Sequence, residues 1–322
     1  MTEAATKTPE EILERGLESH FGRPVRIVEA ESEPLDSFST QPISRLRVTL
    51  DDGKRLPVIF KRLEPKPEKH ARGEVLTYRR LLSGRRFGAP ELYASLRDEE
   101  RNLYWLFLED VGEWKLEWCE TEVWPSAFRW MARMHAEYHG REKELRSLNC
   151  LDEHGSEFYR ALAAAARRSL GEKGEPEARV RFDRLMERFL EFSVEYLAHQ
   201  PRTLVHGDAS CHNFIVRPGP EIRPIDWEWA ATGPAAWDVM KLLSGWGRKK
   251  PKLLAAYLEE FERHAPLDRK GFERALEHCR IMHTLWYLRW WTKPCKDPEF
   301  VNRLLDKMES TWLRLEGERV GV

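Results

Sequence analysis

The sequence predicts an α+β protein in two parts, a strand-rich N-terminal part and a mostly helical C-terminal part. The chain has 322 residues, more than a single hydrophobic core usually organises. Its hydrophobic residues alternate in short runs up to about residue 110 and then recur at helical spacing. We therefore divide the sequence into residues 1–110 and 111–322.

Composition narrows the range of partners. The net charge of -1 gives no general attraction to polyanions, so nucleic acid is not an expected partner. The N-terminus lacks a basic start followed by an apolar run, and no stretch approaches the ~20 apolar residues of a membrane span. With five cysteines and no CxxC pair, a cytoplasmic protein with reduced thiols is expected. The pairs Cys211–His212 and Cys279–His283 lack evident further zinc ligands, and the oligomeric state stays open.

The first part begins with a helix followed by the strands "VRIVEAE", "ISRLRVTL" and "KRLPVIFKRL". Residues 51–53, Asp-Asp-Gly, form a hairpin turn between the last two of these strands, which indicates an antiparallel sheet. A helix follows the charged segment "EPKPEKHARG", because Ala71, Val75, Tyr78 and Leu82 share one face. "APELYASL" and "NLYWLFLEDV" supply two more strands.

A strand-rich island interrupts the helical second part at residues 204–229. "TLVHGDASCHNFIVRPGPEIRPIDWEW" is typical of a strand, a polar loop and a hairpin that turns at "PGPE". If the hairpin is symmetric about the bond between residues 219 and 220, Asn213 faces Asp226 with Cβ atoms roughly 5 Å apart. Pro224 permits the alternative of a bulge that shifts the register by one residue.

The polar residues of this island suit phosphoryl transfer. Mg²⁺ prefers oxygen ligands, which Asn213 and Asp226 offer. Asp208 lies five residues before Asn213, where its carboxylate could accept the proton of a hydroxyl that attacks phosphorus. We expect His206 to support the loop by hydrogen bonding. The spacing His-x-Asp-x-x-x-x-Asn, followed by a hairpin and an aspartate, is the arrangement that kinases use.

With its flanks, this segment resembles the aminoglycoside phosphotransferase and choline kinase family. The resemblance rests on "LVHGDASCHNFIV" and "PIDWEWAATGPAAWDVMKLL", is supported by "WMARMH" ending at His135, and covers most of the chain. It implies the two-lobed protein-kinase-like fold, with Asp208 as catalytic base and Asn213 and Asp226 holding magnesium. Asp238 is expected to cap a helix or brace a loop, and His135 to pack in the interior.

The N-terminal part should then bind the nucleotide. Lys61 ends a strand, and Glu74 lies beside the apolar face of the next helix, so the two can pair. In the resembled family such a pair orients the α- and β-phosphates of ATP. The backbone from Glu109 to Val111, in "LYWLFLEDVGE", would hydrogen-bond adenine. The resemblance thus implies ATP and Mg²⁺ as cofactors.

One expected feature departs from the family's pattern. A phosphate-covering loop usually contains glycine, which lets backbone N–H groups approach phosphate closely. The corresponding turn "EPLDSFSTQP" has none, so Ser37, Ser39 and Thr40 would have to donate instead. GTP therefore stays open beside ATP. A catalytically silent nucleotide-binding or scaffold protein on the same fold is the rival to a kinase.

The acceptor is expected to be a small molecule with a hydroxyl group. Residues 241–322 contain 17 Lys and Arg against 12 Asp and Glu, which disfavours a polycationic aminoglycoside. The acidic segment 113–122, "EWKLEWCETE", instead favours a cationic acceptor. In "HTLWYLRWWTKP", Trp286 and Trp290 share a helical face with Tyr287 and Trp291 beside them. These rings are either core or a cation-π cage for a choline- or ethanolamine-like amino alcohol.

Overall fold

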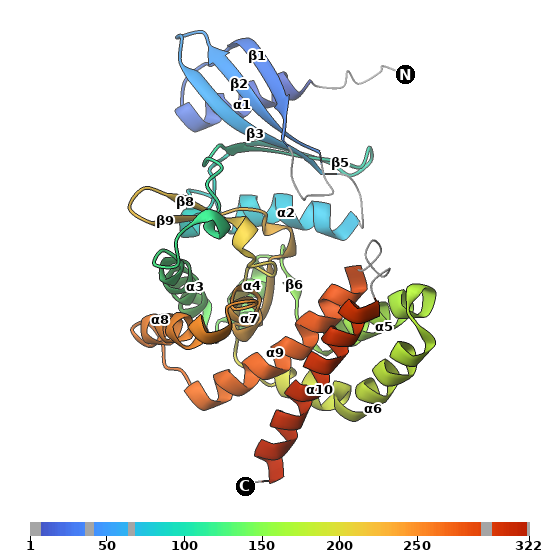
Figure 1. Ribbon diagram of the computed structural model, residues 1–322. Helices are drawn as coiled ribbons and strands as arrows, with labels where there is room; N and C mark the ends of the chain where they lie inside the picture. The colour runs from blue at the N-terminus through green and yellow to red at the C-terminus, as the bar shows by residue number, and fades with distance from the viewer. Residues whose placement is uncertain (1–7, 36–41, 64–67, 291–297, 321–322) are drawn as a thin grey trace. The chain divides into compact units, whose positions relative to one another are not determined.

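The computed structural model describes residues 8–35, 42–63, 68–290 and 298–320 (Figure 1). Its internal contacts divide the chain into two compact units that interleave along the sequence. The first unit comprises Met1–Ser126, Leu148–Leu151 and Cys211–Ala230, and the second comprises Ala127–Ser147, Asp152–Ser210 and Ala231–Val322. The expected α+β class is confirmed. The division of the sequence at residue 110 into two functional lobes stays a prediction.

A five-stranded antiparallel sheet forms the body of the first unit. Its strands are β1 (Ile27–Pro34), β2 (Ile43–Leu50), β3 (Arg55–Leu63), β4 (Leu92–Asp98) and β5 (Leu103–Glu109). They lie in the order β1-β2-β3-β5-β4. Each corresponds to a strand expected from the alternation of hydrophobic residues, and Gly53, at φ 80°, closes the β2–β3 turn.

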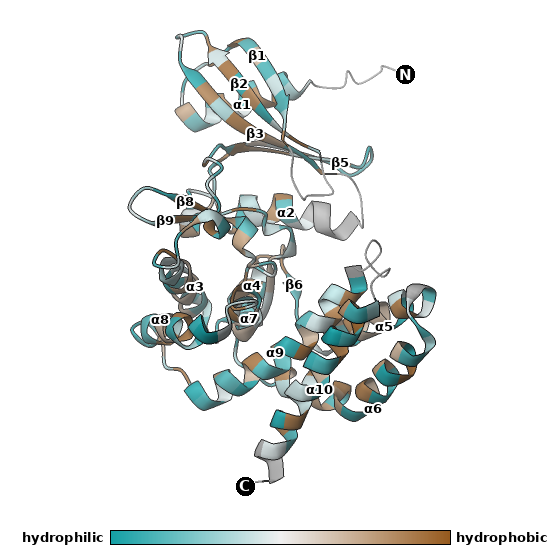
Figure 2. Cartoon of the chain, in the orientation of Figure 1, coloured by the Kyte–Doolittle hydropathy of each residue, from teal (hydrophilic) through white to brown (hydrophobic). Residues whose placement is uncertain are grey.

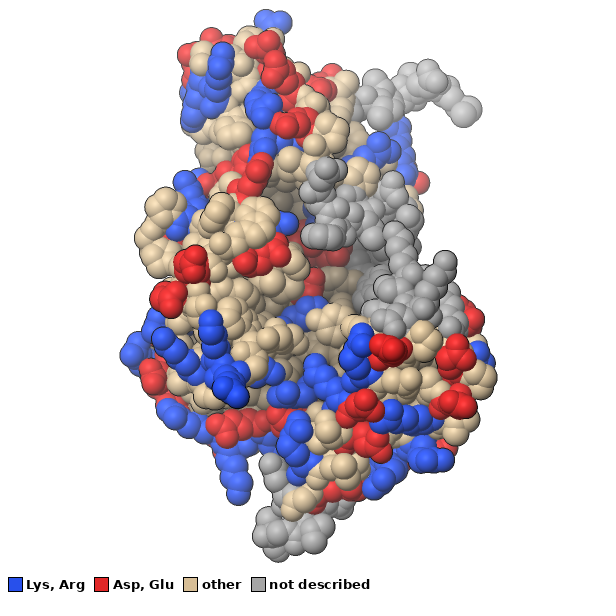
Figure 3. All heavy atoms as spheres, viewed as in Figure 1, with Lys and Arg blue, Asp and Glu red and all other residues tan. Residues whose placement is uncertain are grey.

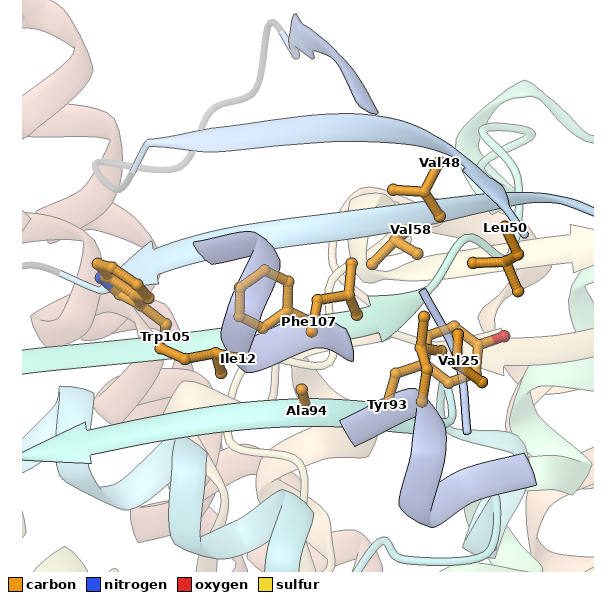
Figure 4. Close-up of a cluster of buried hydrophobic side chains, with 11 residues drawn as sticks. Ile12, Val25, Val48, Leu50, Val58, Tyr93, Ala94, Trp105 and Phe107 are labelled. Atoms are coloured by element: carbon orange, nitrogen blue, oxygen red, sulfur yellow. The ribbon is translucent and has the colours of Figure 1, made fainter. Parts of the chain in front are cut away.

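One face of this sheet is covered by α1 (Pro9–Phe21). The helix starts at a capping box in which Thr8 and Glu11 satisfy each other's backbone N–H groups. Its buried face joins Val58 and Phe107 of the strands in one hydrophobic cluster (Figure 4). Ile12 is the helix residue labelled there. This packing fixes which face of each strand points to the interior.

The helix α2 (Glu68–Arg80) contacts β4 and β5. Val75, Tyr78 and Leu82 of the expected apolar face are buried, while the side chain of Ala71 lies outside the described residues. The same helix contacts η4 (Trp227–Trp229), a short 3-10 turn that follows the hairpin. The first unit therefore brings together α2 and a segment about 150 residues later in the sequence.

The hairpin consists of β8 (Phe214–Arg217) and β9 (Glu221–Pro224), preceded by η3 (Cys211–Asn213). Phe214 pairs with Pro224, so the symmetric register was wrong and the one-residue shift is correct. The reason is a three-residue loop with Gly219 at φ 86°, which centres the turn on a residue rather than on a bond. Asn213 consequently faces Ile225, whose N–H donates to the Asn213 carbonyl at 2.9 Å.

The second unit is built mainly from helices. They are α3 (Trp124–Tyr138, whose first three residues belong to the first unit), α4 (Glu142–Ser147), α5 (Ser156–Lys173), α6 (Pro176–Ala198), α7 (Ala236–Leu242), α8 (Lys250–Glu262), α9 (Arg269–Trp290) and α10 (Pro298–Val320). α5 packs against α6 and α9, α10 packs against the same two helices, and α7 packs against α9. Hydrophobic and hydrophilic residues alternate around α6 and α10, as amphipathic helices require (Figure 2).

A small sheet in the second unit positions the loop that contains Asp208. It consists of β6 (Asp152–Glu153), β10 (Ala231–Pro234) and β7 (Arg202–Val205), with β10 in the middle. The chain leaves β7 directly into residues 206–210. Anchoring β7 beside β10 thus fixes where this loop begins.

The visible surface of the second unit carries a mixture of charges (Figure 3). Arg181 pairs with Asp306 and Glu309, and Arg188 pairs with Glu316, so ion pairs connect α6 to α10. Such partly exposed pairs contribute roughly 0–1 kcal/mol each, so the buried faces of the helices dominate their packing. Every helix in the described part of the chain is too short or too polar to cross a membrane.

Candidate functional site

Lys61 of β3 lies between two carboxylates of the first unit. Its Nζ is 2.9 Å from Oε1 of Glu74 on α2 and 2.5 Å from Oδ1 of Asp226, which follows β9. Lys61 and Glu74 are both buried. They form the ion pair expected from the sequence, and three of the proposed site residues come together. Asp226 has a left-handed backbone, φ 63°, which sets its side-chain direction independently of strand alternation.

Sequence reasoning missed a third carboxylate in this group, that of Glu228. Glu74, Asp226 and Glu228 each offer an oxygen, and these oxygens lie within 4.8 Å of one another. Although burial alone would lower it, the pKa of Lys61 is raised well above its usual value by Asp226 and Glu74. Burial, followed by the charge of Asp226, raises the pKa of Glu228 to about 8.

These groups fit a hard divalent cation. Three carboxyl groups face one ammonium, and burial together with the neighbouring carboxylates favours the protonated form of Glu228. An ion such as Mg²⁺, which takes oxygen ligands, would supply positive charge to this group. Asn213 is buried in the same unit and carries an amide oxygen, the kind of ligand expected from the sequence.

The segment expected to bind adenine is held on several sides within the first unit. Glu109 ends β5, and its N–H donates to the carbonyl of Glu91 at 2.8 Å. Asp110 accepts from Arg45 at 2.6 Å and from the Gly112 N–H at 2.9 Å. Because the Glu109 N–H is already engaged, the proposed contact falls to other backbone groups between Glu109 and Val111.

Arg223 is a second residue that sequence reasoning missed. It is 3% exposed, and it donates to the Glu109 carboxylate at 2.7 Å and to the Gly88 carbonyl at 2.6 Å. The hairpin is therefore attached to the end of β5 through a buried cation. The available signal was an arginine between apolar residues in "EIRPID", because a charge in such a strand requires a buried partner.

The loop that carries Asp208 belongs to the second unit and is braced by Asp238. The fully buried Asp238 carboxylate accepts from the N–H groups of His206 at 2.6 Å and Gly207 at 3.0 Å. It also lies 3.2 Å from Nε2 of His135, whose Nδ1 is 2.8 Å from the Tyr257 hydroxyl. The loop-bracing interpretation of Asp238 is confirmed. His135 does more than fill space, because it connects this carboxylate to α8.

Burial by itself would raise the pKa of Asp238, but His135 and the loop N–H groups hold it below its usual value. The brace is therefore an ionised carboxylate. Gly207 has φ 82°, a conformation that glycine adopts without strain, which explains the glycine between His206 and Asp208.

The Asp208 side chain is one-quarter exposed, so it is accessible from solvent. Its Oδ1 lies 2.9 Å from Nζ of Lys241 on α7. Sequence reasoning missed this lysine. The signal available was its place on the helix three residues after Asp238, because residues at that spacing share a helical face.

Two expectations fall on residues without a described placement. Ser37, Ser39 and Thr40 of the glycine-free turn lie outside the described residues, as do Trp291 and the side chain of Trp290. Trp286 is buried and Tyr287 is about one-third exposed. Trp286 lies 5.9 Å from the Trp237 ring, so this member of the aromatic group belongs to the core.

The two Cys–His pairs differ in their surroundings. Glu117 joins Cys211 and His212 in a group whose potential ligand atoms lie within 4.8 Å of one another, so that pair does have a third candidate ligand. The Nε2 of His283 instead lies 2.8 Å from the Trp237 carbonyl, and burial lowers the pKa of His283 to about 3. The His283 ring is therefore a buried, hydrogen-bonded part of the interior of the second unit.

Together, the antiparallel sheet with its buried Lys–Glu pair and the braced aspartate loop define the class of kinase-like phosphotransferases. Residues 42–275 match the phosphotransferase enzyme family, APH, and the chain belongs to that family.

Individual proteins are similar to this chain over part of its sequence or in fold. The chain is 30% identical to Stress response kinase A of Escherichia coli K12 over 96 residues. The matched segment covers 30% of this chain and only 28% of that relative's length. The ethanolamine kinase of Plasmodium vivax has a TM-score of 0.59 and 14% identity, over 89% of this chain and 83% of that one.

Aminoglycoside phosphotransferase APH(3'')-Id of Streptomyces rimosus, solved with ADP and streptomycin, has a TM-score of 0.52 and 16% identity. That comparison covers 80% of this chain and 92% of the other. At these identities the solved structures show the shared fold, and a nucleotide is bound in one of them.

Proposed function

We propose that the protein transfers the γ-phosphoryl group of ATP to a hydroxyl of a small molecule. The observation that carries the proposal is the buried contact of Lys61 with both Glu74 and Asp226. It brings an ammonium and two carboxylates together in the first unit. Membership of the phosphotransferase family supports the same reaction. We expect it to occur in the cytoplasm, where ATP is abundant and thiols stay reduced.

In this proposal each residue of the first unit has a binding role. Lys61, oriented by Glu74, neutralises phosphate oxygens of the nucleotide. Asn213 and Asp226 hold Mg²⁺, and Glu228 contributes a further oxygen once it loses its proton. When bound, the ion supplies positive charge to the β- and γ-phosphates. The Glu109 carbonyl and the Val111 N–H bind adenine.

Asp208 has the proton-transfer role. Its carboxylate accepts the proton of the acceptor hydroxyl while that oxygen forms a bond to the γ-phosphorus and the bond between phosphorus and ADP breaks. The brace from Asp238 keeps the loop in one conformation, which limits the reorganisation needed at the moment of reaction.

Magnesium-dependent ADP release tests this proposal. The wild type and Asp208→Asn should be compared over aminoglycosides, choline, ethanolamine, homoserine, sugars and nucleosides. We expect acceptor-stimulated release by the wild type, a loss of roughly 10²–10⁴-fold in Asp208→Asn, and unchanged Mg-ATP binding. Asp183→Asn, at a partly exposed ion pair with Arg167, is the control. A fully active Asp208→Asn enzyme contradicts the assignment of the base.

The metal role of Asp226 needs a separate measurement. Asp226→Ala should weaken ATP binding in magnesium and have a smaller effect in EDTA, because the variant loses an ion ligand as well as a partner of Lys61. Calorimetric titration with ATP and with GTP under both conditions measures this and also determines the nucleotide preference. An affinity equally affected with and without magnesium contradicts the assignment.

The rival function is nucleotide binding or scaffolding without turnover, and the glycine-free turn "EPLDSFSTQP" favours it. Nucleotide binding without Asp208-dependent product would support this rival, as would failure to bind nucleotide. The alternative acceptor class is an amino alcohol, as named for the ethanolamine kinase that shares the fold, and the acceptor panel tests it.

A further inference from the structure

A positively charged side chain lies directly beside the proposed base. Lys241 Nζ is 2.9 Å from Oδ1 of Asp208, and the lysine side chain is 9% exposed. Although burial alone would lower it, the pKa of Lys241 is raised, chiefly by the Asp208 carboxylate. The ammonium is therefore charged at neutral pH, and any acceptor whose hydroxyl reaches Asp208 meets this charge.

The aromatic rings near this point already contact cations of the protein. Lys241 Nζ lies 5.2 Å from the ring centroid of Tyr287 and 5.8 Å from that of Trp286. Arg289 Cζ lies 4.3 Å from the Trp286 centroid. A quaternary ammonium that sought these ring faces would meet two like charges. This arrangement opposes the cation-cage interpretation of the cluster.

Apart from Asp208, the groups around Lys241 do little to compensate its positive charge. Asp238 is the second carboxylate that acts on it, but Asp238 is fully buried and accepts the N–H groups of His206 and Gly207. His283 also faces this region, and burial lowers its pKa to about 3, so its ring adds no charge at neutral pH. Asp208 and Lys241 thus present a base and a cation side by side.

We propose that Lys241 is a specificity-determining residue that selects acceptors with an anionic group, a carboxylate or a phosphate, close to the reacting hydroxyl. The inference rests on the proposed function, because it takes Asp208 as the group that receives the hydroxyl proton. The Lys241 ammonium lies 2.9 Å from Asp208. When the acceptor hydroxyl is at Asp208, an anionic group on the same acceptor is therefore within reach of this ammonium. The hydroxyl oxygen bonds to phosphorus and its proton passes to Asp208. The acceptor's anionic group is unchanged.

Three small acceptors test the proposal, because they differ mainly in charge. Glycerate and glycerol share two hydroxyl groups, and glycerate has a carboxylate where glycerol has its third hydroxyl-bearing carbon, while choline carries a quaternary ammonium. ADP release should be measured at constant ionic strength for the wild type, Lys241→Met and Lys241→Arg. We expect the wild-type kcat/KM for glycerate to exceed that for glycerol at least tenfold, with choline lowest.

The lysine variants separate charge from shape. Lys241→Met should reduce the glycerate-to-glycerol ratio of kcat/KM at least tenfold, and Lys241→Arg should keep most of the preference. Calorimetric titration of glycerate and choline into the Mg-ADP-loaded wild type gives a second readout that needs no turnover. There, glycerate should bind at least tenfold more tightly than choline.

Several results would overturn the proposal. They are a preference for choline, equal responses to all three acceptors, or no effect of any of them on ADP release or on binding. If Lys241→Met lowers all rates by one factor, including hydrolysis of ATP by water, the lysine acts on the transferred phosphoryl group instead. Failure of the proposed function is distinguishable. Wild-type ADP release would then be absent, or equal to that of Asp208→Asn, and this inference would fail with it.

Discussion

Arg223 donates to the Glu109 carboxylate at 2.7 Å, although the two residues are 114 positions apart in the sequence. The contact joins the strand that precedes Asp226 to the end of the strand proposed to bind adenine. Arg223 is 3% exposed, so the pair is shielded from water. The proposed nucleotide contacts and the proposed metal ligands of the first unit therefore share a structural support.

Replacing Arg223 should destabilise the protein strongly. Arg223→Met leaves the largely buried Glu109 carboxylate without its main partner, and we expect the free energy of unfolding to fall by about 3 kcal/mol. Urea unfolding measures this. Arg217→Met, at an exposed position of the same hairpin, is the control and should change stability by at most ~0.5 kcal/mol. Equal losses in the two variants would show that the buried pair has no special importance.

Asp238→Asn should also be strongly destabilising. The new amide places an NH₂ donor against a backbone N–H donor of the loop and removes the charge that His135 faces. We expect a loss of about 3 kcal/mol in urea unfolding. Asp183→Asn breaks only a partly exposed ion pair and should cost at most ~1 kcal/mol. A small effect at Asp238 would mean that the loop keeps its conformation without the brace.

Two glycine-to-alanine variants should change stability in opposite directions. Gly207→Ala forces an alanine to φ 82° and should cost about 1–2 kcal/mol. Gly171→Ala lies within α5, where an added Cβ meets no atom within 4 Å, and should stabilise by ~0.5–1 kcal/mol. Thermal unfolding of both variants measures the sign of each change in stability. A neutral or stabilising Gly207→Ala contradicts the backbone argument.

Acid should destabilise the second unit through buried histidines. Burial lowers the pKa values of His154, His278 and His283 to about 3, against 6.5 for a free side chain. The folded state keeps these rings neutral, whereas the unfolded chain binds protons below pH 6.5. Stability should therefore fall as the pH drops from 6.5 toward 3, by about 1.4 kcal/mol per pH unit for each histidine.

One variant isolates a single ring. His278→Gln keeps a polar group near the Ser193 hydroxyl, which lies 2.9 Å from Nδ1 of His278. Between pH 7 and 5 this variant should lose about 2 kcal/mol less unfolding free energy than the wild type. His199→Gln, at an exposed position, is the matched substitution and should retain the wild-type loss. An unchanged pH dependence in His278→Gln contradicts the prediction.

The sequence predicted what local patterns determine. The five strands of the sheet follow from alternation of hydrophobic residues, and the contact of Lys61 with Glu74 follows from a strand leading into a helix. The hairpin register was predicted wrongly, because a Pro-Gly-Pro turn permits loops of two or three residues and only the backbone geometry decides between them.

Glu228, Arg223 and Lys241 were missed for a different reason. The raised pKa of Glu228 depends on its burial beside other carboxylates. Lys241 contacts Asp208, which is 33 positions away in the sequence. Neither burial nor such a distant contact leaves a periodic pattern in the chain. The loop-bracing role of Asp238 was predicted correctly, because the segment around it resembles the family even though no periodic pattern marks the contact.

The interleaving of the two units also limits how such a protein can be divided or recombined. The first unit acquires Asp226 and Glu228 only from a segment inserted within the second, and the chain passes from one unit to the other between Ser210 and Cys211. An N-terminal fragment ending at Ser126 would contain the whole sheet but none of these acidic groups. Exchanging one unit between relatives would require three segments to be swapped at once. The proposed nucleotide site and the proposed acceptor site therefore cannot be exchanged as single continuous segments.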